Sequence, residues 1–309
     1  MGNIVVTGAA GFIGQHLVRS LLRCTSDMIV GVDNLHRGRW DGLLELAHSQ
    51  REAFAQTPLR LIEGDVRDPA PLSSAMRDAH TVFHLAAQSN VLGAVADIGY
   101  SFETNVIGTF NVLRAARAAG VRCVVFTSSR EVYGEPHALP VEESFPLTAK
   151  NPYGASKIAA EAYCRVFDSA EMRVVVLRLA NVYGPGDRDR VIPIFVERVK
   201  QGLPLVLYGG EQVIDFVPVD FVVEAIVRAA EVRPAEPVNV GSGRGTTLKD
   251  LARLALKLSG SPVGWEIAPA RPVEVTRFVA NVERMRRWLG LEPPEDPLVQ
   301  VPSLLAAAR

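Results

Sequence analysis

Short apolar runs alternate with amphipathic stretches through the first half of the chain. The stretches F-I-G-Q-H-L-V-R-S-L-L (12–22) and N-V-L-R-A-A-R-A-A (111–119) have the apolar spacing of helices, and Gly120 is a helix-ending signal after the second. The apolar runs between them are short and rich in β-branched residues, which is typical of buried strands. These expected strands cover residues 3–7, 28–33, 59–63, 81–85, 123–127 and 174–179.

This alternation predicts the fold class. Strands that are apolar on both faces, with helices between them, indicate a parallel sheet covered by helices on both sides. We therefore predict an α/β protein with a doubly wound parallel sheet of the Rossmann type.

The pattern changes after about residue 181, where prolines and glycines become denser and the strict alternation fades. A strand at 237–241 and a helix at 221–230 still follow the earlier pattern. We predict that residues 1–180 form the Rossmann domain and that residues 181–309 mainly form a smaller C-terminal α/β domain. Residues 212–242 are expected to return to the sheet of the first domain.

The composition is that of an ordinary globular protein. The 309 residues are 48% hydrophobic and 22% charged, with a formal net charge of -1. A chain so balanced carries no broad basic field, so we expect no nucleic-acid partner. It has no signal-peptide pattern and no apolar run near the roughly 20 residues that span a bilayer. Three distant cysteines do not make a disulfide framework, and we predict a cytoplasmic protein without a membrane partner.

A glycine-rich turn links the first expected strand to the first expected helix. Gly8, Gly11 and Gly14 have the spacing G-x-x-G-x-x-G within T-G-A-A-G-F-I-G. Absent side chains let the backbone approach a pyrophosphate, and the free N–H groups of the helix N-terminus point at it. A merely tight strand-to-helix turn is the alternative, and the glycines alone do not exclude it.

Asp33 favours the dinucleotide interpretation. It ends the second expected strand, where an acid accepts hydrogen bonds from an adenosine ribose. A carboxylate there repels a 2′-phosphate, so NAD is expected rather than NADP, although Arg37 and Arg39 soften this preference. A solvated turn residue is the alternative role for Asp33, and Asp65 is a second candidate for the adenine edge.

Tyr153 and Lys157 lie four residues apart in Y-G-A-S-K, on one face of a helix that begins near Pro152. A free tyrosine titrates near pH 10. A neighbouring ammonium and a cationic nicotinamide would both favour the phenolate, which makes Tyr153 a usable base. By itself Y-x-x-x-K is common on protein surfaces, but the glycine turn and Ser129 upstream favour a catalytic role.

Taken together, these segments resemble one family almost from end to end. The chain is similar to the extended short-chain dehydrogenases/reductases, and within them to the nucleotide-sugar epimerases and dehydratases. The resemblance rests on T-G-A-A-G-F-I-G, V-D-N-L, G-D-V-R-D, H-L-A-A-Q, N-V-I-G-T, S-S-R-E-V-Y-G, Y-G-A-S-K, R-L-A-N-V-Y-G-P-G, L-Y-G-G-E-Q, N-V-G-S-G and A-R-P-V-E-V.

The resemblance implies roles for individual residues. Asn105 would support the active-site helix, and Asn181 would meet the sugar nucleotide. Tyr208 would lie against the base, and Arg271 would grip the diphosphate. The cofactor-binding residues implied are Gly8, Gly11, Phe12, Ile13, Gly14, Asp33, Asn34, Asp65, Val66, Leu85, Ala86, Ala87, Asn105, Tyr153 and Lys157. The substrate-binding residues implied are Ser129, Arg130, Tyr153, Asn181, Val191, Tyr208, Arg271 and Phe278.

The resemblance also implies the chemistry. Tyr153 would remove the proton from the sugar's 4-hydroxyl while the C4 hydride moves to a tightly bound NAD, which is regenerated in each turnover. Lys157 would hold the nicotinamide ribose and the phenolate, and Ser129 would relay the proton. The 4-ketone then takes the hydride back on its other face in an epimerase, or loses water across C5 and C6 in a dehydratase. An NAD-dependent nucleotide-sugar 4-epimerase is the leading hypothesis, and a dehydratase or an NAD(P)-dependent sugar-nucleotide reductase is the alternative.

The pair Arg130–Glu131 leaves two interpretations open. Dehydratases of this family carry adjacent acids at these positions, and an arginine cannot act as a general acid. In one interpretation the two residues form a structural salt bridge. In the other, Glu131 is catalytic and takes a proton at C5.

Two further positions depart from the family or vary within it. Ile214 stands where many members carry a diphosphate-binding arginine, a contact that Arg188 or Arg190 would have to supply here. Phe278 falls where the family places a residue that limits the size of the sugar pocket, and a core role is the alternative.

We reject a metal site, because His80 and His84 flank a strand and four strand residues span about 13 Å. The helices expected at 101–119 and 153–169 would pair across a homodimer by the same resemblance. A module that only senses NAD would be expected to lose Tyr153, Lys157 or Ser129, and all three are present.

Overall fold

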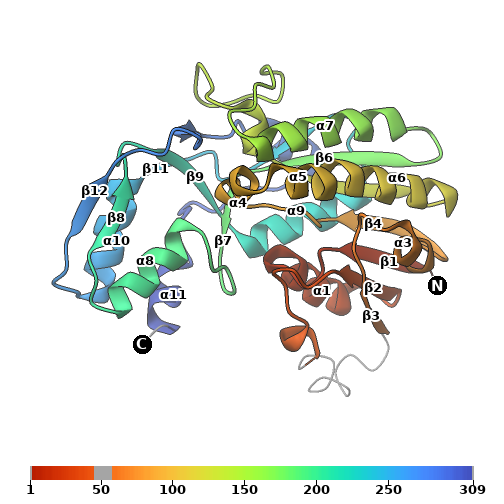
Figure 1. Ribbon diagram of the computed structural model, residues 1–309, viewed down its shortest axis with the longest axis horizontal. Helices are drawn as coiled ribbons and strands as arrows, with labels where there is room; N and C mark the ends of the chain where they lie inside the picture. Colours follow the sequence, from red (N-terminus) through yellow and green to blue (C-terminus); the bar gives the residue numbers. More distant parts are fainter. Residues whose placement is uncertain (1, 45–57, 308–309) are drawn as a thin grey trace.

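A seven-stranded parallel sheet is the centre of the larger lobe in the computed structural model, which describes residues 2–44 and 58–307 (Figure 1). Its strand order is β10-β6-β5-β4-β1-β2-β3. The strands are β1 (Asn3–Thr7), β2 (Met28–Asp33), β3 (Leu59–Glu63), β4 (Ala79–His84), β5 (Cys123–Ser129), β6 (Arg173–Leu179) and β10 (Val238–Val240). The doubly wound α/β fold and all six strands expected in the first half are confirmed, with ends that move by at most two residues.

The register brings the chemically interesting strand ends to one edge of this sheet. Thr7 of β1 lies level with Val32 of β2 and with His84 of β4. Ser129, the last residue of β5, lies level with Leu179 of β6. The loops that follow these strands therefore open on the same side, as in other parallel α/β sheets.

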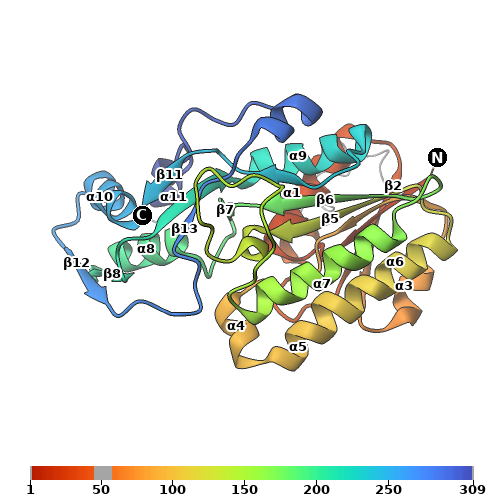
Figure 2. The same cartoon turned by 90° about the horizontal axis from the view of Figure 1, so that it is seen from above.

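Helices cover both faces of the sheet (Figure 2). One layer holds α3, η1, α6 and α7, with the short α4 and α5 beside them, and the other holds α1, α9 and η3. Successive strand residues serve opposite layers: Val5 packs toward α3, α6 and α7, whereas Ile4 and Val6 pack toward α1 and α9. The bounds are α1 (Phe12–Cys24), α3 (Pro69–Ala75), α4 (Val91–Ala96), α5 (Ile98–Phe102), η1 (Glu103–Ile107), α6 (Gly108–Ala118), α7 (Pro152–Phe167), α9 (Val219–Val232) and η3 (Met285–Leu289).

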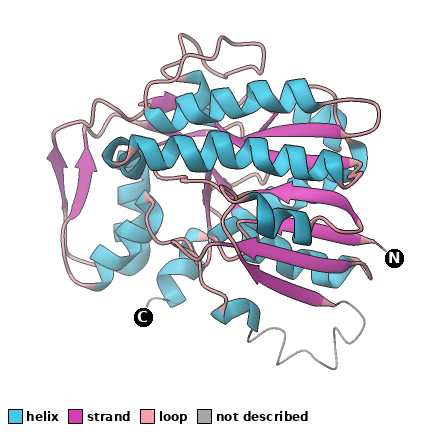
Figure 3. Cartoon of the chain, turned by 45° about the vertical axis from the view of Figure 1, so that its right-hand side comes forward, coloured by secondary structure: helices cyan, strands magenta, loops and turns pink. Residues whose placement is uncertain are grey.

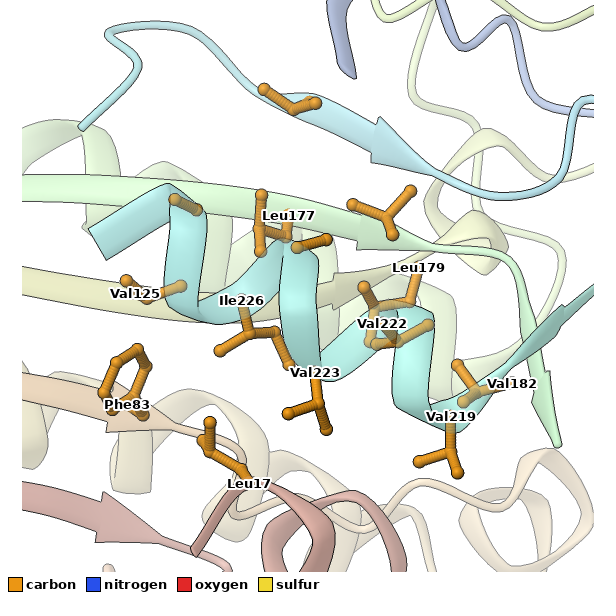
Figure 4. Packing of buried hydrophobic residues seen from close by; sticks show 14 of the residues in the cluster. Leu17, Phe83, Val125, Leu177, Leu179, Val182, Val219, Val222, Val223 and Ile226 are labelled. Carbon is orange, nitrogen blue, oxygen red and sulfur yellow. The ribbon is translucent and has the colours of Figure 1, made fainter. Parts of the chain in front are cut away.

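Helix α9 shows why the second layer binds the sheet. Val219, Val222, Val223 and Ile226 recur at helical spacing and are buried together against the sheet (Figure 4). The helix ends at Arg233, which adopts a left-handed conformation with φ 54°. Truncating the buried Ile226 to alanine costs about 2–5 kcal/mol, so this face of α9 is a main anchor of the fold.

The smaller lobe has its own sheets and helices (Figure 3). A four-stranded sheet joins β7 (Asn181–Tyr183), β9 (Val213–Pro218), β11 (Gly245–Thr247) and β13 (Arg277–Phe278), and a parallel pair joins β8 (Leu205–Tyr208) to β12 (Trp265–Ala268). The helices are α8 (Val191–Lys200), α10 (Leu248–Ser259) and α11 (Val301–Ala307). They enclose a separate apolar core with Phe195, Leu207 and Phe216 at its centre.

The prediction for residues 212–242 needs a correction. Helix α9 and strand β10 do return to the seven-stranded sheet, where β10 pairs with β6. Strand β9 does not, because it pairs with β7, β11 and β13 in the smaller lobe. In the described part of the chain, no helix is long and apolar enough to cross a membrane.

Candidate active site

A cavity of about 780 Å³ lies at the carboxyl edge of the main sheet and extends to the smaller lobe. The ends of β1, β2, β4 and β5 contribute to its lining, as do α7, α8 and β8. The position agrees with the general rule that ligands of open α/β sheets bind beyond the carboxyl ends of the strands. Predicted site residues that line it are Gly8, Gly11, Phe12, Ile13, Gly14, Asp33, Asn34, Val66, Leu85, Ala86, Ala87, Ser129, Arg130, Glu131, Tyr153, Lys157, Asn181, Val191, Tyr208 and Arg271.

The glycine turn leaves a cradle that side chains would fill. Gly8 has φ +73°, and a Cβ there would lie 2.6 Å from the backbone nitrogen of Ala86. A Cβ on Gly14 would lie 2.0 Å from the carbonyl oxygen of Gly8. Helix α1 starts at this turn with Gly11 as its N-cap, without a side-chain cap and without an acid in the first turn. Free N–H groups at an uncharged helix start suit a pyrophosphate, so the cradle fits a dinucleotide.

Asp33 closes the turn from the second strand. Its Oδ2 accepts a hydrogen bond from the backbone N–H of Ala10 (3.0 Å), and its Oδ1 accepts one from Leu35 (2.9 Å). Burial raises the pKa of Asp33, and these backbone donors act in the opposite direction. The carboxylate thus stands at the cavity wall, where it would meet the ribose of a bound dinucleotide.

Three predicted residues lie outside the cavity lining. Both carboxylate oxygens of Asp65 accept hydrogen bonds from the Arg67 side chain, and Oδ2 also accepts one from Asn34. Burial acts to raise the pKa of Asp65, but these hydrogen bonds hold it at about 2. Phe278 is fully buried and stacks on Tyr133 with ring centroids 5.9 Å apart. The structure therefore places Asp65 in an ion-pair cluster and Phe278 in the core, and the pocket-limiting interpretation of Phe278 is corrected.

Asn105 is the third of these residues, and it contacts helix α7, which carries Tyr153, from outside the cavity. Its Nδ2 donates to Oγ of Ser156 on α7 (2.8 Å), and its Oδ1 accepts from the backbone N–H of Gln88 (2.8 Å). It lies in η1, a π-helical segment that interrupts the helix before α6. Asn105 thus joins α7 to the loop after β4, the loop that lines the cavity through Leu85 and Ala86.

Helix α7 presents Tyr153 and Lys157 to the cavity. Asn151 caps it by accepting from the N–H of Gly154 (2.8 Å), and Pro152 occupies the first turn. Lys157 Nζ donates to the carbonyl of Thr127 (2.9 Å) at the end of β5. The same ammonium lies 6.0 Å from the centre of the Tyr153 ring. The predicted base and cation are therefore held side by side at the sheet edge.

Burial dominates the protonation of this pair. It raises the pKa of Tyr153 to about 12, although a hydrogen bond with Ser129 and the charges of Arg190 and Arg130 act to lower that pKa. Burial also lowers the pKa of Lys157 to about 8. The phenol is thus protonated at neutral pH in the protein alone, and a further positive charge in the cavity is needed to make it a base.

Glu131 is engaged on both oxygens. Its Oε1 lies 2.9 Å from Nη2 of Arg130, and its Oε2 accepts from Nδ2 of Asn151 (2.7 Å). Both side chains of the ion pair are largely buried, 12% exposed for Arg130 and 6% for Glu131. The salt bridge expected in one of the two interpretations is present.

Several residues that line this cavity carry a buried oxygen without a hydrogen-bond partner. Within residues 2–44 and 58–307 the unpartnered atoms that belong to lining residues are Gln88 Oε1, Thr104 Oγ1, Asn181 Oδ1, Asp187 Oδ2 and Gln212 Oε1. Buried polar atoms of this kind are costly unless a ligand, a water or a small rearrangement satisfies them. Of these five residues, only Asn181 has a role predicted from the sequence. Gln88 and Gln212 lie in the family-like segments H-L-A-A-Q and L-Y-G-G-E-Q.

The C-terminal part of the chain supplies arginines to the cavity. Arg271 lies over the Tyr208 ring, 3.5 Å from its centre, and pairs with Glu274 (3.0 Å). Arg190 lies over the Phe12 ring and pairs with Asp187 (2.8 Å). Arg188 and Ile214 also line the cavity, so Arg188, Arg190 and Arg271 share its wall with the residue that stands in place of an arginine.

Two loops that line the cavity meet directly. Arg37, after β2, forms an ion pair with Asp189, which precedes α8. Nε2 of His16 on α1 lies 2.8 Å from the carbonyl oxygen of Pro185 in the same loop. The segment before α8 is therefore docked onto the dinucleotide half of the cavity.

Comparison with known proteins agrees with this geometry. Residues 4–241 match the model of the NAD dependent epimerase/dehydratase family. The UDP-glucose 4-epimerase of Mycolicibacterium smegmatis is 36% identical over 301 residues, 94% of this chain and 93% of that protein. The dTDP-glucose 4,6-dehydratase of Neisseria gonorrhoeae is 32% identical over 334 residues, 96% and 93%. A solved structure, the Thermus thermophilus UDP-glucose 4-epimerase complex with NAD, superimposes with a TM-score of 0.87 at 32% identity, covering 99% of each chain.

Proposed function

Because the chain belongs to the NAD-dependent epimerase/dehydratase family, we propose that it is a nucleotide-sugar 4-epimerase that works through a transient 4-keto sugar. The enzyme's cofactor is NAD, and the glycine cradle, the start of α1 and Asp33 are the residues that would hold it. Bound NAD supplies a hydride acceptor, and afterwards a hydride donor, for C4 of the sugar. The related proteins include both epimerases and dehydratases, so the choice between these reactions depends on the residues around Tyr153.

Tyr153 is the proposed base for the 4-hydroxyl. A phenolate is the acceptor that this proton needs, and burial alone disfavours it. Lys157, held by the Thr127 carbonyl, places a positive charge beside the ring, and Ser129 hydrogen-bonds the phenol. Together they stabilise the phenolate while the 4-hydroxyl loses its proton, and the same tyrosine returns the proton when the ketone is reduced.

The observation that favours epimerisation over elimination is the state of Glu131. Loss of water across C5 and C6 requires one group to take the C5 proton and another to protonate the leaving hydroxyl. Glu131 has both oxygens in contact with Arg130 and Asn151, and Arg130 cannot supply a proton. Arg130 and Glu131 are therefore poorly suited to serve as the acid and base of an elimination. Tyr153 and Lys157, which the proposed reversible oxidation at C4 uses, lie side by side.

Product analysis without added NAD tests this proposal. The purified protein is incubated with UDP-, dTDP-, CDP-, GDP- and ADP-sugars, and the products are examined by mass spectrometry and NMR. We expect a product of unchanged mass with an inverted C4 signal. Loss of one water would replace the epimerase by a dehydratase, and net oxidation of added NAD(P)H would indicate a reductase.

We also propose that the enzyme is a homodimer. Large apolar side chains are exposed along α5, η1 and α7, where these helices lie side by side on one outer face (Figure 2). Val166 is 73% exposed and Phe102 is 51% exposed, which a monomer in water would not favour. Sedimentation analysis should show a dimer that Val166→Lys dissociates, and a monomeric wild-type protein would contradict the proposal.

A cytoplasmic location is proposed on the state of the cysteines. Cys24, Cys123 and Cys164 are all free thiols, two of them buried. Free thiols are typical of proteins in reducing compartments. Cell fractionation with an antibody to the protein would test the location.

A further inference from the structure

The proposed steps at C4 assign Arg130 no contact with the substrate, although Arg130 lines the cavity. Arg130 starts the short 3-10 helix η2 (Arg130–Tyr133), directly after Ser129. Oγ of Ser129 caps this turn by accepting from the N–H of Glu131 (3.2 Å). The backbone that carries Arg130 is thus fixed to the residue that hydrogen-bonds the Tyr153 phenol.

The guanidinium is oriented but not saturated. Its Nη2 pairs with Glu131, and its Cζ lies 6.0 Å from the centre of the Phe278 ring. In the described part of the chain it makes no other ion pair or hydrogen bond, whereas a guanidinium carries several N–H donors in a planar fork. Glu131 is itself held by Asn151, so the pair sets the direction in which the unused donors point.

Arg130 lies at the reacting end of the cavity, because it lines the cavity together with Ser129 and Tyr153 and directly follows Ser129 in the chain. Besides Lys157, whose ammonium lies 6.0 Å from the centre of the phenol ring, the charged groups that act on the phenol include Arg190, Glu131 and Arg130. Arg190 is paired with Asp187, and Glu131 is paired with Arg130 and Asn151. Of these cations, Arg130 is the one that directly follows Ser129 in the chain, and it keeps N–H donors that Glu131 does not take.

The proposed position of C4 limits which groups of the sugar can contact the guanidinium of Arg130. If the 4-hydroxyl lies at Tyr153 and Ser129, the neighbouring groups are those on C3 and on C5. A planar guanidinium with spare donors matches a carboxylate better than a single hydroxyl, because two parallel N–H···O bonds form. In a hexuronic acid the carboxylate is attached to C5, one carbon away from the reacting centre.

We propose that Arg130 selects a nucleotide-linked hexuronic acid by binding the C6 carboxylate, and that Glu131 is the positioning residue that aims it. The inference rests on the proposed function, which places C4 at Tyr153. A neutral hexose offers only one uncharged hydroxyl at C6, which satisfies the remaining N–H donors of a largely buried arginine less well than a carboxylate.

Ligand binding to a catalytically silent enzyme tests the inference without requiring turnover. The NAD-loaded Tyr153→Phe variant is titrated by calorimetry with UDP-glucuronic acid and with UDP-glucose, which differ only at C6. We expect the uronate to bind on the order of 10- to 100-fold more tightly. Adding Arg130→Met should remove this preference to within about threefold, whereas Arg130→Lys should retain part of it.

Two controls keep the test decisive. Arg286→Met removes an exposed arginine that pairs with Glu283 and Glu292, and it should leave the preference unchanged. Because Arg130→Met leaves Glu131 buried without its cation, the double variant Arg130→Met/Glu131→Gln removes both charges and should show the same loss of preference. Equal binding of the two sugars, absence of uronate binding, or a preference that survives both Arg130 variants would overturn the inference.

Products of the wild-type enzyme separate this inference from the proposed function. If UDP-glucose is epimerised more efficiently than the uronate, the epimerase stands and the role of Arg130 falls. If the uronate binds in an Arg130-dependent way but loses water or carbon dioxide, the role of Arg130 stands and the epimerase falls.

Discussion

Nδ2 of Asn151 donates to the carboxylate of Glu131 (2.7 Å) while Oδ1 of the same residue caps α7. One asparagine therefore joins the turn after Ser129 to the helix that carries Tyr153. A shift of Glu131 would therefore move both Ser129 and α7, and both oxygens of Glu131 already have a partner.

Glu131→Gln should separate positioning from acid–base chemistry. The amide oxygen can still accept from Asn151, but the ion pair with Arg130 is lost, so we expect KM to rise several-fold and kcat to change less than about threefold. Loss of a largely buried ion pair should lower the free energy of unfolding by roughly 1–3 kcal/mol. Steady-state kinetics and urea denaturation measure both effects. A folded variant whose kcat falls by orders of magnitude would instead make Glu131 an acid–base residue.

Tyr153→Phe should abolish hydride transfer while leaving NAD bound. The phenol hydroxyl is the only part removed, so we expect kcat to fall by about 10²–10⁴-fold, the usual contribution of a positioned base. The NAD content of the purified variant should match that of the wild type. Substantial residual turnover would remove Tyr153 from the role of base.

The Tyr153 phenol should titrate differently with and without cofactor. In the protein alone burial raises its pKa to about 12. A cationic nicotinamide near the ring would favour the phenolate, so the pKa should fall when NAD is bound. Ultraviolet difference titrations that subtract the signal of Tyr153→Phe measure this change. Identical titrations in both states would mean that the cofactor charge does not act on this tyrosine.

Asp33→Ala should weaken the preference for NAD over NADP. Removing the carboxylate removes the repulsion of a 2′-phosphate, and we expect the ratio of the two dissociation constants to change by about tenfold or more. Asp33→Asn, which keeps the shape of the side chain and one oxygen that can accept from the N–H of Ala10 or of Leu35, is the nearest control for turn structure. An unchanged ratio in both variants would exclude Asp33 from the ribose site.

His84 should make the protein sensitive to acid. The ring is 1% exposed, its nitrogens lie 2.7 Å from the Thr7 hydroxyl and 2.9 Å from the Thr109 hydroxyl, and burial lowers its pKa to about 3. Between about pH 3 and 6.5 the unfolded chain binds the proton that the folded chain does not, so stability falls as the pH falls through this window. The loss should reach roughly 3 kcal/mol by about pH 4. Urea denaturation of wild type and His84→Asn measures it, and equal pH slopes would contradict the assignment.

The sequence pattern predicts this fold well where local and global requirements agree. The strands of the main sheet are continuous apolar runs, and α7 combines a capping asparagine, a proline in the first turn and apolar spacing. Strand β9 has the same apolar appearance, but its partners β7, β11 and β13 come from distant parts of the chain. Apolarity shows that a strand is buried and does not show in which sheet.

The site was predictable only where a residue type implies its chemistry. Tyr153, Lys157 and the glycines belong to motifs that can be recognised in the sequence. Gln88, Thr104 and Gln212 are ordinary polar residues, and only the folded structure shows that each has an oxygen without a hydrogen-bond partner. Asp65 has the right position in the sequence for a cofactor contact, but Arg67, two residues later, occupies its carboxylate. Such local competition cannot be seen in a pattern.

The return of α9 and β10 to the main sheet means that the chain cannot be divided into halves. A fragment ending near residue 180 would lack β10 along β6 and lack the helix that covers Leu177 and Leu179, leaving an open edge and a bare apolar face. Both are features that drive chains to aggregate. Efforts to transplant the substrate half between relatives therefore need to exchange two separate segments around α9 and β10, not one contiguous C-terminal piece.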